Sequence, residues 1–253
     1  MRRIITLLTD FGTADGYVAE VKGVLLSAVP DAYLVDLAHD IAPGDVAAAA
    51  YTMHRAWRAF PPGTVHLAVV DPGVGTARRA LAAGVGGRFV VGPDNGIFTH
   101  LFDQVRDERV VELPVPPTAS ATFHGRDVFA PAAAALAGGA AIESLGAPLR
   151  DPVRLPLPPL SVRGDDLAGV IIHVDRFGNL ISNVPGDRVK SGARVRLGAY
   201  ELELQRTFGD VPAGELVAYV GSGGTVEIAV RDGSANSVLG LGLGAEVRVA
   251  LRG

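Results

Sequence analysis

Acidic and basic side chains stand beside glycine-rich turns at two places in the first third of the chain. Asp10 and Asp15 flank the turn DFGTADG, and Asp71 and Arg78 bracket the turn DPGVGTAR. Each turn follows a short apolar run typical of a buried strand. Because the chain has no cysteine, its chemistry must use carboxylates, histidine, arginine, hydroxyls or the backbone.

Two later segments carry further polar groups. TFHGRDVFAP, residues 122–131, places His124 just before an expected helix, and HVDRFGNLISN, residues 173–183, carries Asp175 in a turn. Each feature alone has an ordinary structural explanation, since aspartates cap helices or form turns and a lone histidine is more often a structural residue. Recurrence at several strand ends favours a site, because open parallel sheets bind ligands beyond the carboxyl ends of their strands.

The glycine-rich turns do not match the usual phosphate-binding loops. The chain has no GxxxxGK[ST] motif, no GxGxxG opens a helix after the first strand, and GSGGT at residues 221–225 lies in a β-rich region. A nucleotide phosphate is therefore not the expected ligand. A carboxylate such as Asp10 is better suited to ribose hydroxyls.

The elements that position these groups form two unlike halves. Residues 1–150 alternate strand and helix patterns, which predicts an α/β domain with a largely parallel sheet. Asp45 stands at an expected helix N-cap, and prolines follow the first two helices. We expect strands at 3–9, 32–37, 64–70, 88–91 and 109–113, and helices at 17–28, 46–60, 96–105 and 128–137.

Prolines separate the two halves. Residues 151–164 form a proline-rich linker, because several prolines disfavour both a helix and a central strand. Residues 165–253 show short β-like runs between turns and no convincing helix, which predicts a smaller all-β, barrel-like domain. Its expected strands lie at 168–174, 180–183, 194–197, 200–204, 216–220, 226–230 and 245–251.

Composition limits the partners. The formal net charge is −4, with acids and bases interspersed, and no Lys/Arg block resembles a nucleic-acid footprint. No segment reaches the ~18 apolar residues of a membrane span, and the first residues do not resemble a signal peptide. The sequence predicts a soluble cytoplasmic protein that binds neither nucleic acid nor membrane.

Four motifs in this order, TDFGTADGYVAEVKG, VDPGVGTARR, TFHGRDVFAP and HVDRFGNLISN, resemble one family. It comprises the S-adenosyl-L-methionine (SAM) hydroxide adenosyltransferases, adenosine-forming SAM hydrolases related to the fluorinases and chlorinases. The resemblance also covers DLAHDI at residues 36–41, GPDNG at 92–96 and GSGGTVEIAVRDGSA at 221–235. It implies hydrolysis of SAM to adenosine and methionine, without a cofactor, by a homotrimer whose sites lie between subunits.

The resemblance also implies roles for a polar triad. Asp71, Arg78 and His124 would position the attacking water or hydroxide. The fluorinases of the family carry tyrosine, threonine and serine where this chain has Asp71, Val74 and Gly125. A carboxylate repels a halide by roughly 4 kcal/mol at a separation of about 4 Å and an effective dielectric near 20, but it accepts a hydrogen bond from water. Water is therefore the expected nucleophile.

Substrate-binding residues are implied in both halves. Asp10 would hold the ribose hydroxyls, Asp15 would lie near the methionine amino group, and Phe123 would contact the substrate. The residues expected from the second half of a neighbouring subunit are Asp175, Phe177, Asn179, Ser222, Arg231, Gly233 and Ser234.

The implied reaction is an in-line displacement at C5′ of the ribose. Methionine leaves as a neutral thioether, so neither a general acid nor a metal is needed. The triad member that accepts the proton stays open. Two other functions also stay open: a SAM or nucleoside sensor without turnover, and a metal-dependent phosphohydrolase. The ligands of the phosphohydrolase would be Asp10, Asp71, His124 and Asp175, although these are scattered one per loop.

Overall fold

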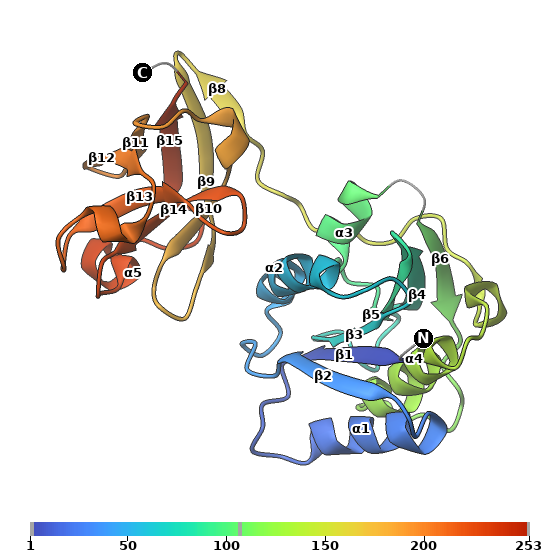
Figure 1. The fold of residues 1–253 in the computed structure, drawn as a ribbon. Helices are drawn as coiled ribbons and strands as arrows, with labels where there is room; N and C mark the ends of the chain where they lie inside the picture. The colour runs from blue at the N-terminus through green and yellow to red at the C-terminus, as the bar shows by residue number, and fades with distance from the viewer. Residues whose placement is uncertain (1–2, 106–107, 252–253) are drawn as a thin grey trace. The chain divides into compact units, whose positions relative to one another are not determined.

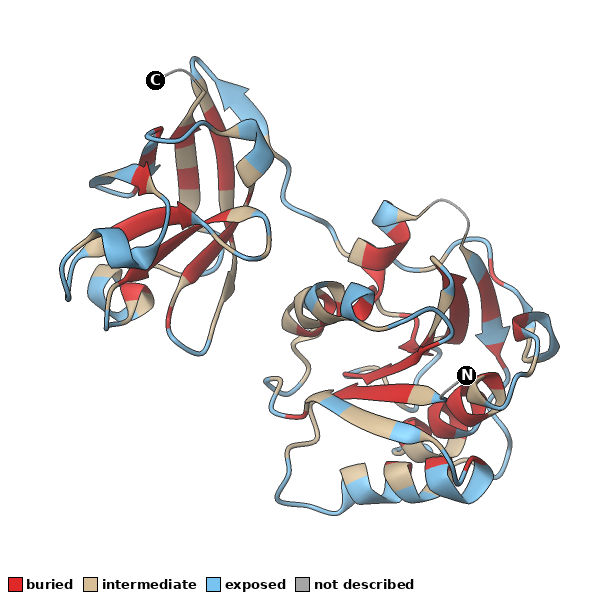
Figure 2. Ribbon diagram, in the orientation of Figure 1, coloured by how far each residue is buried: buried red, intermediate tan, exposed pale blue. Residues whose placement is uncertain are grey.

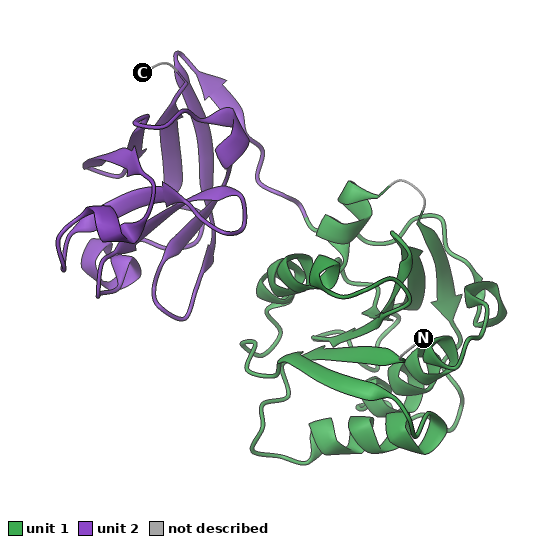
Figure 3. Cartoon of the chain, viewed as in Figure 1, with its two compact units in different colours: residues 1–155 green, residues 156–253 purple. Residues whose placement is uncertain are grey.

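The computed structural model describes residues 3–105 and 108–251. The chain divides into two compact units, Met1–Leu155 and Pro156–Gly253 (Figure 3). Unit 1 mixes helices with a sheet, whereas the regular elements of unit 2 are mainly strands (Figure 1). The expected class, an α/β domain followed by a smaller β domain, is confirmed.

Unit 1 contains a seven-stranded sheet in the order β2-β1-β3-β5-β4-β6-β7. Three pairs of neighbours are parallel: β2 with β1, β1 with β3, and β3 with β5. The other three pairs are antiparallel: β5 with β4, β4 with β6, and β6 with β7. The sheet is therefore mixed, with its parallel half at the strands that precede the candidate turns. The strands are β1 (Ile4–Thr9), β2 (Tyr33–Ala38), β3 (Val65–Val69), β4 (Ala80–Val85), β5 (Arg88–Pro93), β6 (Arg109–Leu113) and β7 (Ala147–Pro148).

Helices cover both faces of this sheet (Figure 1). On one face, α1 (Tyr17–Ala28) and α4 (Ala130–Ala137) pack against Leu7; on the other, α2 (Val46–Ala56) and α3 (Thr99–Gln104) pack against Leu8. Successive strand side chains point to opposite faces, so a strand covered on both sides is apolar throughout. Accordingly, β1 and β3 are buried along nearly their whole length (Figure 2).

In unit 1, β4, the two-residue strand β7 and the start of α4 differ from the prediction. β4 was not expected, because its sequence ALAAGV is rich in alanine and glycine, which are uncommon in strands. All six of its residues are nevertheless buried between β5 and β6. The helix expected from residue 128 is preceded by a π-helical turn, Gly125–Phe129, which continues into α4.

Unit 2 forms a closed barrel. Its sheet runs β10-β14-β13-β12-β11-β15-β9-β8, and β10 also pairs with β9, which closes the ring. One helix, α5 (Ala235–Leu239), was not predicted because it is only five residues long. The strands are β8 (Ser161–Arg163), β9 (Asp166–Val174), β10 (Leu180–Pro185), β11 (Arg194–Leu197), β12 (Tyr200–Gln205), β13 (Leu216–Val220), β14 (Thr225–Val230) and β15 (Glu246–Ala250). Among the helices of residues 3–105 and 108–251, none is both long and apolar enough to cross a membrane.

Candidate active site

The turn after β3 brings Asp71 and Arg78 together. Arg78 donates from Nε to Asp71 Oδ1 over 3.0 Å and from Nη2 to Oδ2 over 2.5 Å. Within the turn, Gly75 has φ of +75°, and a Cβ there would lie 2.5 Å from the carbonyl oxygen of Ala121. Glycine is therefore required at this position. The two ionic side chains are only 5% and 7% exposed, so the fork-shaped ion pair is a buried one.

His124 joins this pair from the start of the π-helical turn. Its Nδ1 lies 3.0 Å from Arg78 Nη2. A guanidinium can only donate, so Nδ1 accepts, and neutral His124 carries its proton on Nε2. Burial and the neighbouring Arg78 charge lower the pKa of His124, which favours this neutral form. Burial raises the pKa of Asp71, although Arg78 and the N–H of Gly73 oppose the shift.

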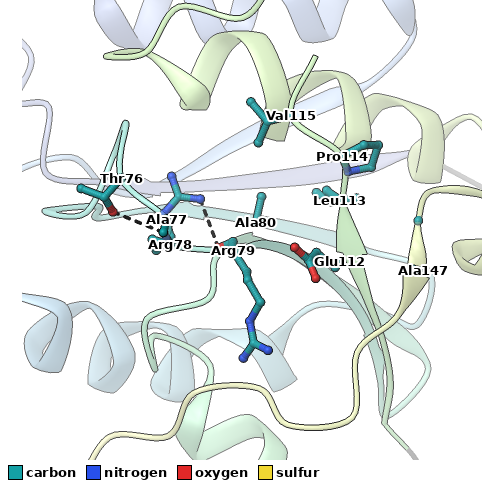
Figure 4. Close-up of a pocket in the computed structure, with 11 residues that line it drawn as sticks. Thr76, Ala77, Arg78, Arg79, Ala80, Glu112, Leu113, Pro114, Val115 and Ala147 are labelled. Atoms are coloured by element: carbon teal, nitrogen blue, oxygen red, sulfur yellow. Dashed lines mark hydrogen bonds between the residues drawn. The ribbon is translucent and has the colours of Figure 1, made fainter. Parts of the chain in front are cut away.

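Arg78 is held on a further side by the backbone. Its Nη1 donates to the carbonyl of Arg79 over 3.1 Å, and its own N–H donates to Thr76 Oγ1 over 3.3 Å (Figure 4). Four of the five guanidinium N–H groups are therefore engaged: one on Nε, two on Nη2 and one on Nη1. Arg78 also lines a cavity of about 420 Å³ with Glu112 and Val115 (Figure 4). The guanidinium is therefore fixed before any ligand binds.

A cavity of about 290 Å³ is lined by most of the predicted residues of unit 1. It lies where β1 and β3 end, as expected for a parallel sheet. Asp71 and His124 line it directly, whereas Arg78 does not line it but is bonded to both. Asp15 is exposed in the turn before α1 and does not line the cavity. The lining residues are Asp10, Phe11, Pro43, Gly44, Val69, Asp71, Pro72, Val74, Thr122, Phe123, His124 and Gly125.

The backbone of Gly44 orients Asp10 in this cavity. Gly44 N–H donates to Asp10 Oδ2 over 2.8 Å, and Gly44 has φ of +75°, a conformation that favours glycine. On the wall of the same cavity, the Phe123 ring packs edge-on against Phe11 with centroids 5.8 Å apart. The cavity thus combines a carboxylate with an aromatic wall, a composition suited to a nucleoside.

Unit 2 gathers most of its predicted residues at one end of the barrel. In the turn between β9 and β10, Asp175 Oδ1 accepts from the N–H groups of Phe177 and Asn179, each over 2.9 Å. Asp175 Oδ2 accepts from Asn179 Nδ2 over 2.9 Å. These bonds also fit the ordinary turn-forming explanation of Asp175. Phe177 is left 75% exposed.

The same turn packs against the start of α5. Asn236 N–H donates to the carbonyl of Gly178 over 2.9 Å. A Cβ on Gly178 would lie 2.0 Å from Ser234 Oγ, so only glycine allows this approach. Ser234 caps α5 by accepting from Ser237 N–H. Gly233 and Arg231 lie in this segment, directly after β14. Ser222 lies in the turn before β14, at the opposite end of that strand.

The motif GPDNG supports the site, although no role was predicted for it. Asn95 Nδ2 donates to the carbonyl of Val70 over 2.8 Å, next to Asp71. The carboxylate of Asp94, with its side chain 1% exposed, pairs with Arg79. The motif was visible in the sequence, but nothing in its composition shows that it contacts a turn some twenty residues earlier.

Metal ligands are not grouped in the parts of the chain that the structure describes. There, no cluster of three or more His, Cys, Asp or Glu side chains is placed to hold a metal ion. Asp71 and His124 are instead engaged with Arg78. The three ligands proposed for a phosphohydrolase in unit 1, Asp10, Asp71 and His124, therefore do not form a metal site among the described residues.

Fold and site together define a two-domain α/β protein of the enzyme class, with a pre-formed carboxylate–guanidinium–imidazole triad in a ligand-sized cavity. Residues 5–146 match the family model of the SAM hydroxide adenosyltransferase N-terminal domain, and residues 169–248 match that of the C-terminal domain. The chain belongs to the SAM hydroxide adenosyltransferase family.

Its relatives extend over the whole chain. An (R)-S-adenosyl-L-methionine hydrolase from Thermus thermophilus is 47% identical, covering 98% of this chain and 99% of its own. A fluorinase from Actinopolyspora mzabensis is 30% identical, covering 98% of this chain and 97% of its own. The crystal structure of an uncharacterized conserved protein from Thermotoga maritima has a TM-score of 0.91 at 35% identity and covers 97% of this chain and 99% of its own.

Proposed function

We propose that this chain hydrolyses SAM to adenosine and L-methionine, by in-line attack of water or hydroxide on C5′ of the ribose. The observation that carries the proposal is the bridge that Arg78 forms between Asp71 and His124, both on the wall of the cavity. The 47% identity to a SAM hydrolase supports it. The carboxylate at position 71 favours water over a halide, because like charges repel.

The tautomer of His124 determines which member of the triad donates a hydrogen bond and which accepts a proton. Because Nδ1 accepts from Arg78, His124 offers an N–H at Nε2 and no lone pair toward the nucleophile. Asp71 is then the group that accepts the proton of water, and its raised pKa makes it a better base than an ordinary aspartate. Arg78 holds both partners and stabilises the developing negative charge on oxygen.

The bonds and electrons of the step balance. The oxygen of water forms a bond to C5′, the bond between C5′ and sulfur breaks, and its electron pair stays on sulfur. Methionine leaves as a neutral thioether, so no acid is needed for the leaving group. Alignment of water opposite the sulfonium supplies up to ~7–11 kcal/mol in favourable systems. Asp10 would hold the ribose hydroxyls, Phe123 would contact the nucleoside and Asp15 would lie near the amino group of methionine.

We further propose that the chain forms a homotrimer, with each site completed by unit 2 of a second copy. The residues supplied would be those around the β9–β10 turn. Support comes from large apolar side chains exposed on this end of unit 2: Phe177 at 75%, Val238 at 58% and Leu243 at 66%. Such exposure is typical of a surface that becomes buried in an assembly. Light scattering, which gives the mass of the assembly, together with an activity assay of the same sample tests this. A fully active monomer would contradict the proposal.

Product analysis tests the proposed function. Purified protein is incubated with SAM, with and without EDTA, and the products are separated by chromatography. Equal amounts of adenosine and methionine in both samples support a hydrolase that needs no metal. Intact SAM bound to the protein would instead indicate a sensor, and activity lost with EDTA and restored by a divalent ion would indicate a metal enzyme.

A further inference from the structure

The motif DLAHDI contributes a buried histidine that the proposed mechanism does not use. His39 follows β2 and is 7% exposed. Its Nδ1 lies 2.8 Å from Thr9 Oγ1, at the last residue of β1. Its Nε2 lies 3.0 Å from Asp36 Oδ1, although this contact is not aligned as a strong hydrogen bond. The ring therefore connects the ends of two neighbouring parallel strands.

The charge of Asp36 determines which nitrogen of His39 donates and which accepts a hydrogen bond. Although burial opposes the shift, the hydrogen bond and charge of Lys22, together with the nearby His39, hold the pKa of Asp36 below its ordinary value, so Asp36 is ionised. A lone pair on His39 Nε2 would repel a carboxylate oxygen 3.0 Å away, and Nε2 therefore carries the proton. In the neutral ring, Nδ1 then accepts from the hydroxyl of Thr9. Thr9 Oγ1 in turn accepts from Phe11 N–H over 3.3 Å.

The chain of contacts ends at the cavity wall. Phe11 and the preceding residue, Asp10, both line the cavity. The backbone of His39 holds the same turn a second time, because its carbonyl accepts from Gly12 N–H over 2.8 Å. A Cβ on Gly125 would lie 3.2 Å from Phe11 Cζ, so the Phe11 ring also touches the segment that carries His124. A shift of Phe11 would therefore alter both sides of the cavity.

We propose that His39 is a positioning residue, which fixes the turn of Asp10 and Phe11 through Thr9 and so shapes the nucleoside pocket. This inference rests on the proposed function. His39 does not line the cavity, and the triad lies on other segments, so its loss should weaken SAM binding more than it slows the chemical step.

Two substitutions at position 39 separate the contacts. In His39→Asn the side-chain oxygen takes the place of Nδ1 and can still accept from Thr9. In His39→Gln the amide lies near the position of Nε2, and the acceptor for Thr9 is lost. Thr9→Val removes the hydroxyl at nearly constant size. We expect KM for SAM to rise roughly tenfold in His39→Gln and Thr9→Val, and kcat to stay within about twofold. His39→Asn should keep KM within about twofold of the parent value.

Thr64→Val is the matched control. Thr64 is 1% exposed and donates to the carbonyl of Pro61 over 2.8 Å, but it precedes β3 and so lies at the other end of the sheet. It should lower thermal stability and leave KM unchanged. An unchanged KM in Thr9→Val and His39→Gln would overturn the proposal. An equal rise of KM in His39→Asn, His39→Gln and Thr9→Val would also overturn it. Should the parent protein fail to hydrolyse SAM, the proposed function fails, and calorimetric SAM binding to the same variants still tests the positioning role.

Discussion

Arg78 Nη2 donates to His124 Nδ1 over 3.0 Å while the same guanidinium holds both carboxylate oxygens of Asp71. This arrangement fixes the tautomer of the neutral histidine, and in the proposed mechanism it leaves the aspartate as the proton acceptor of the triad. It also places a permanent positive charge in contact with both Asp71 and His124. The three groups therefore act as one unit, and the consequences of changing each can be stated separately.

Asp71→Asn should reduce kcat by about tenfold or more and leave SAM affinity nearly unchanged, because it removes a base from the chemical step. Steady-state kinetics and calorimetry measure the two effects. Asp151→Asn is the control, since Asp151 also pairs with an arginine, Arg79, but its side chain is 81% exposed. Undiminished turnover in Asp71→Asn would exclude Asp71 as the proton acceptor.

The acid limb of the pH dependence of kcat should include the protonation of His124, together with that of Asp71. Burial and Arg78 lower the pKa of His124 below the ordinary value of 6.5, so the ring stays neutral at pH 6.5 and gains a proton only in more acidic solution. That proton on Nδ1 would break the bond from Arg78, and kcat should therefore fall as the pH drops through this lowered pKa. A pH–rate profile of the parent protein measures the midpoint. A midpoint above 6.5 would contradict the neutral tautomer.

Substitutions of His124 separate its two nitrogens. His124→Gln places an amide donor near the position of Nε2, whereas His124→Asn keeps only an acceptor near Nδ1. Because the mechanism needs the N–H at Nε2, Gln should retain more activity than Asn, by roughly fivefold if one hydrogen bond is worth about 1 kcal/mol. Comparison of kcat for the two variants at neutral pH tests this order, and the reverse order would indicate that contact with Arg78 is the main role.

Asp10→Ala should weaken SAM binding. A hydrogen bond to a charged group is worth ~1.5–3 kcal/mol, so the dissociation constant should rise roughly 10- to 150-fold. Isothermal titration with SAM measures this. Asp45→Ala, which removes a helix N-cap on α2, is a control that should lower stability without this effect. An unchanged affinity in Asp10→Ala would remove Asp10 from the ribose site.

Stability should decrease between pH 6.5 and 4 because of His66. Burial lowers its pKa to about 4 in the folded protein. In this window the unfolded chain binds a proton at His66 and the folded chain does not, so the free energy of unfolding falls as the pH falls, by up to about 3 kcal/mol. Urea unfolding of the parent protein and of His66→Asn at pH 7 and 4.5 tests this. Equal pH dependence in both would show that His66 is not the cause.

The fold could be predicted where a single local sequence pattern determines a helix or a strand. The continuous apolar runs of β1 and β3 identify strands buried on both faces, and Asp45 marks the start of α2 by accepting from Ala48 N–H. β4 escaped prediction because only its position between two strands makes ALAAGV a strand. The five-residue helix α5 depends on the cap at Ser234, which a short polar segment does not reveal.

The site was predictable from motifs but not from spacing. Arg78 and His124 are 46 residues apart in the chain, and only the family resemblance placed them together. The supports were not predicted at all: the Gly44 bond to Asp10 and the contact of His39 with Thr9 depend on loops that meet only in the folded chain. Hydrogen bonds between distant loops leave no periodic signal in a sequence.

The most direct measurement follows the oxygen of water. Protein treated with EDTA is incubated with SAM in ¹⁸O-labelled water, and the adenosine formed is analysed by mass spectrometry. Attack of water at C5′ predicts one ¹⁸O atom in the 5′-hydroxyl of adenosine, with unlabelled methionine in equal amount. Adenosine without the label, or methylthioadenosine as the nucleoside product, would show that water does not attack C5′ and would contradict the proposed mechanism.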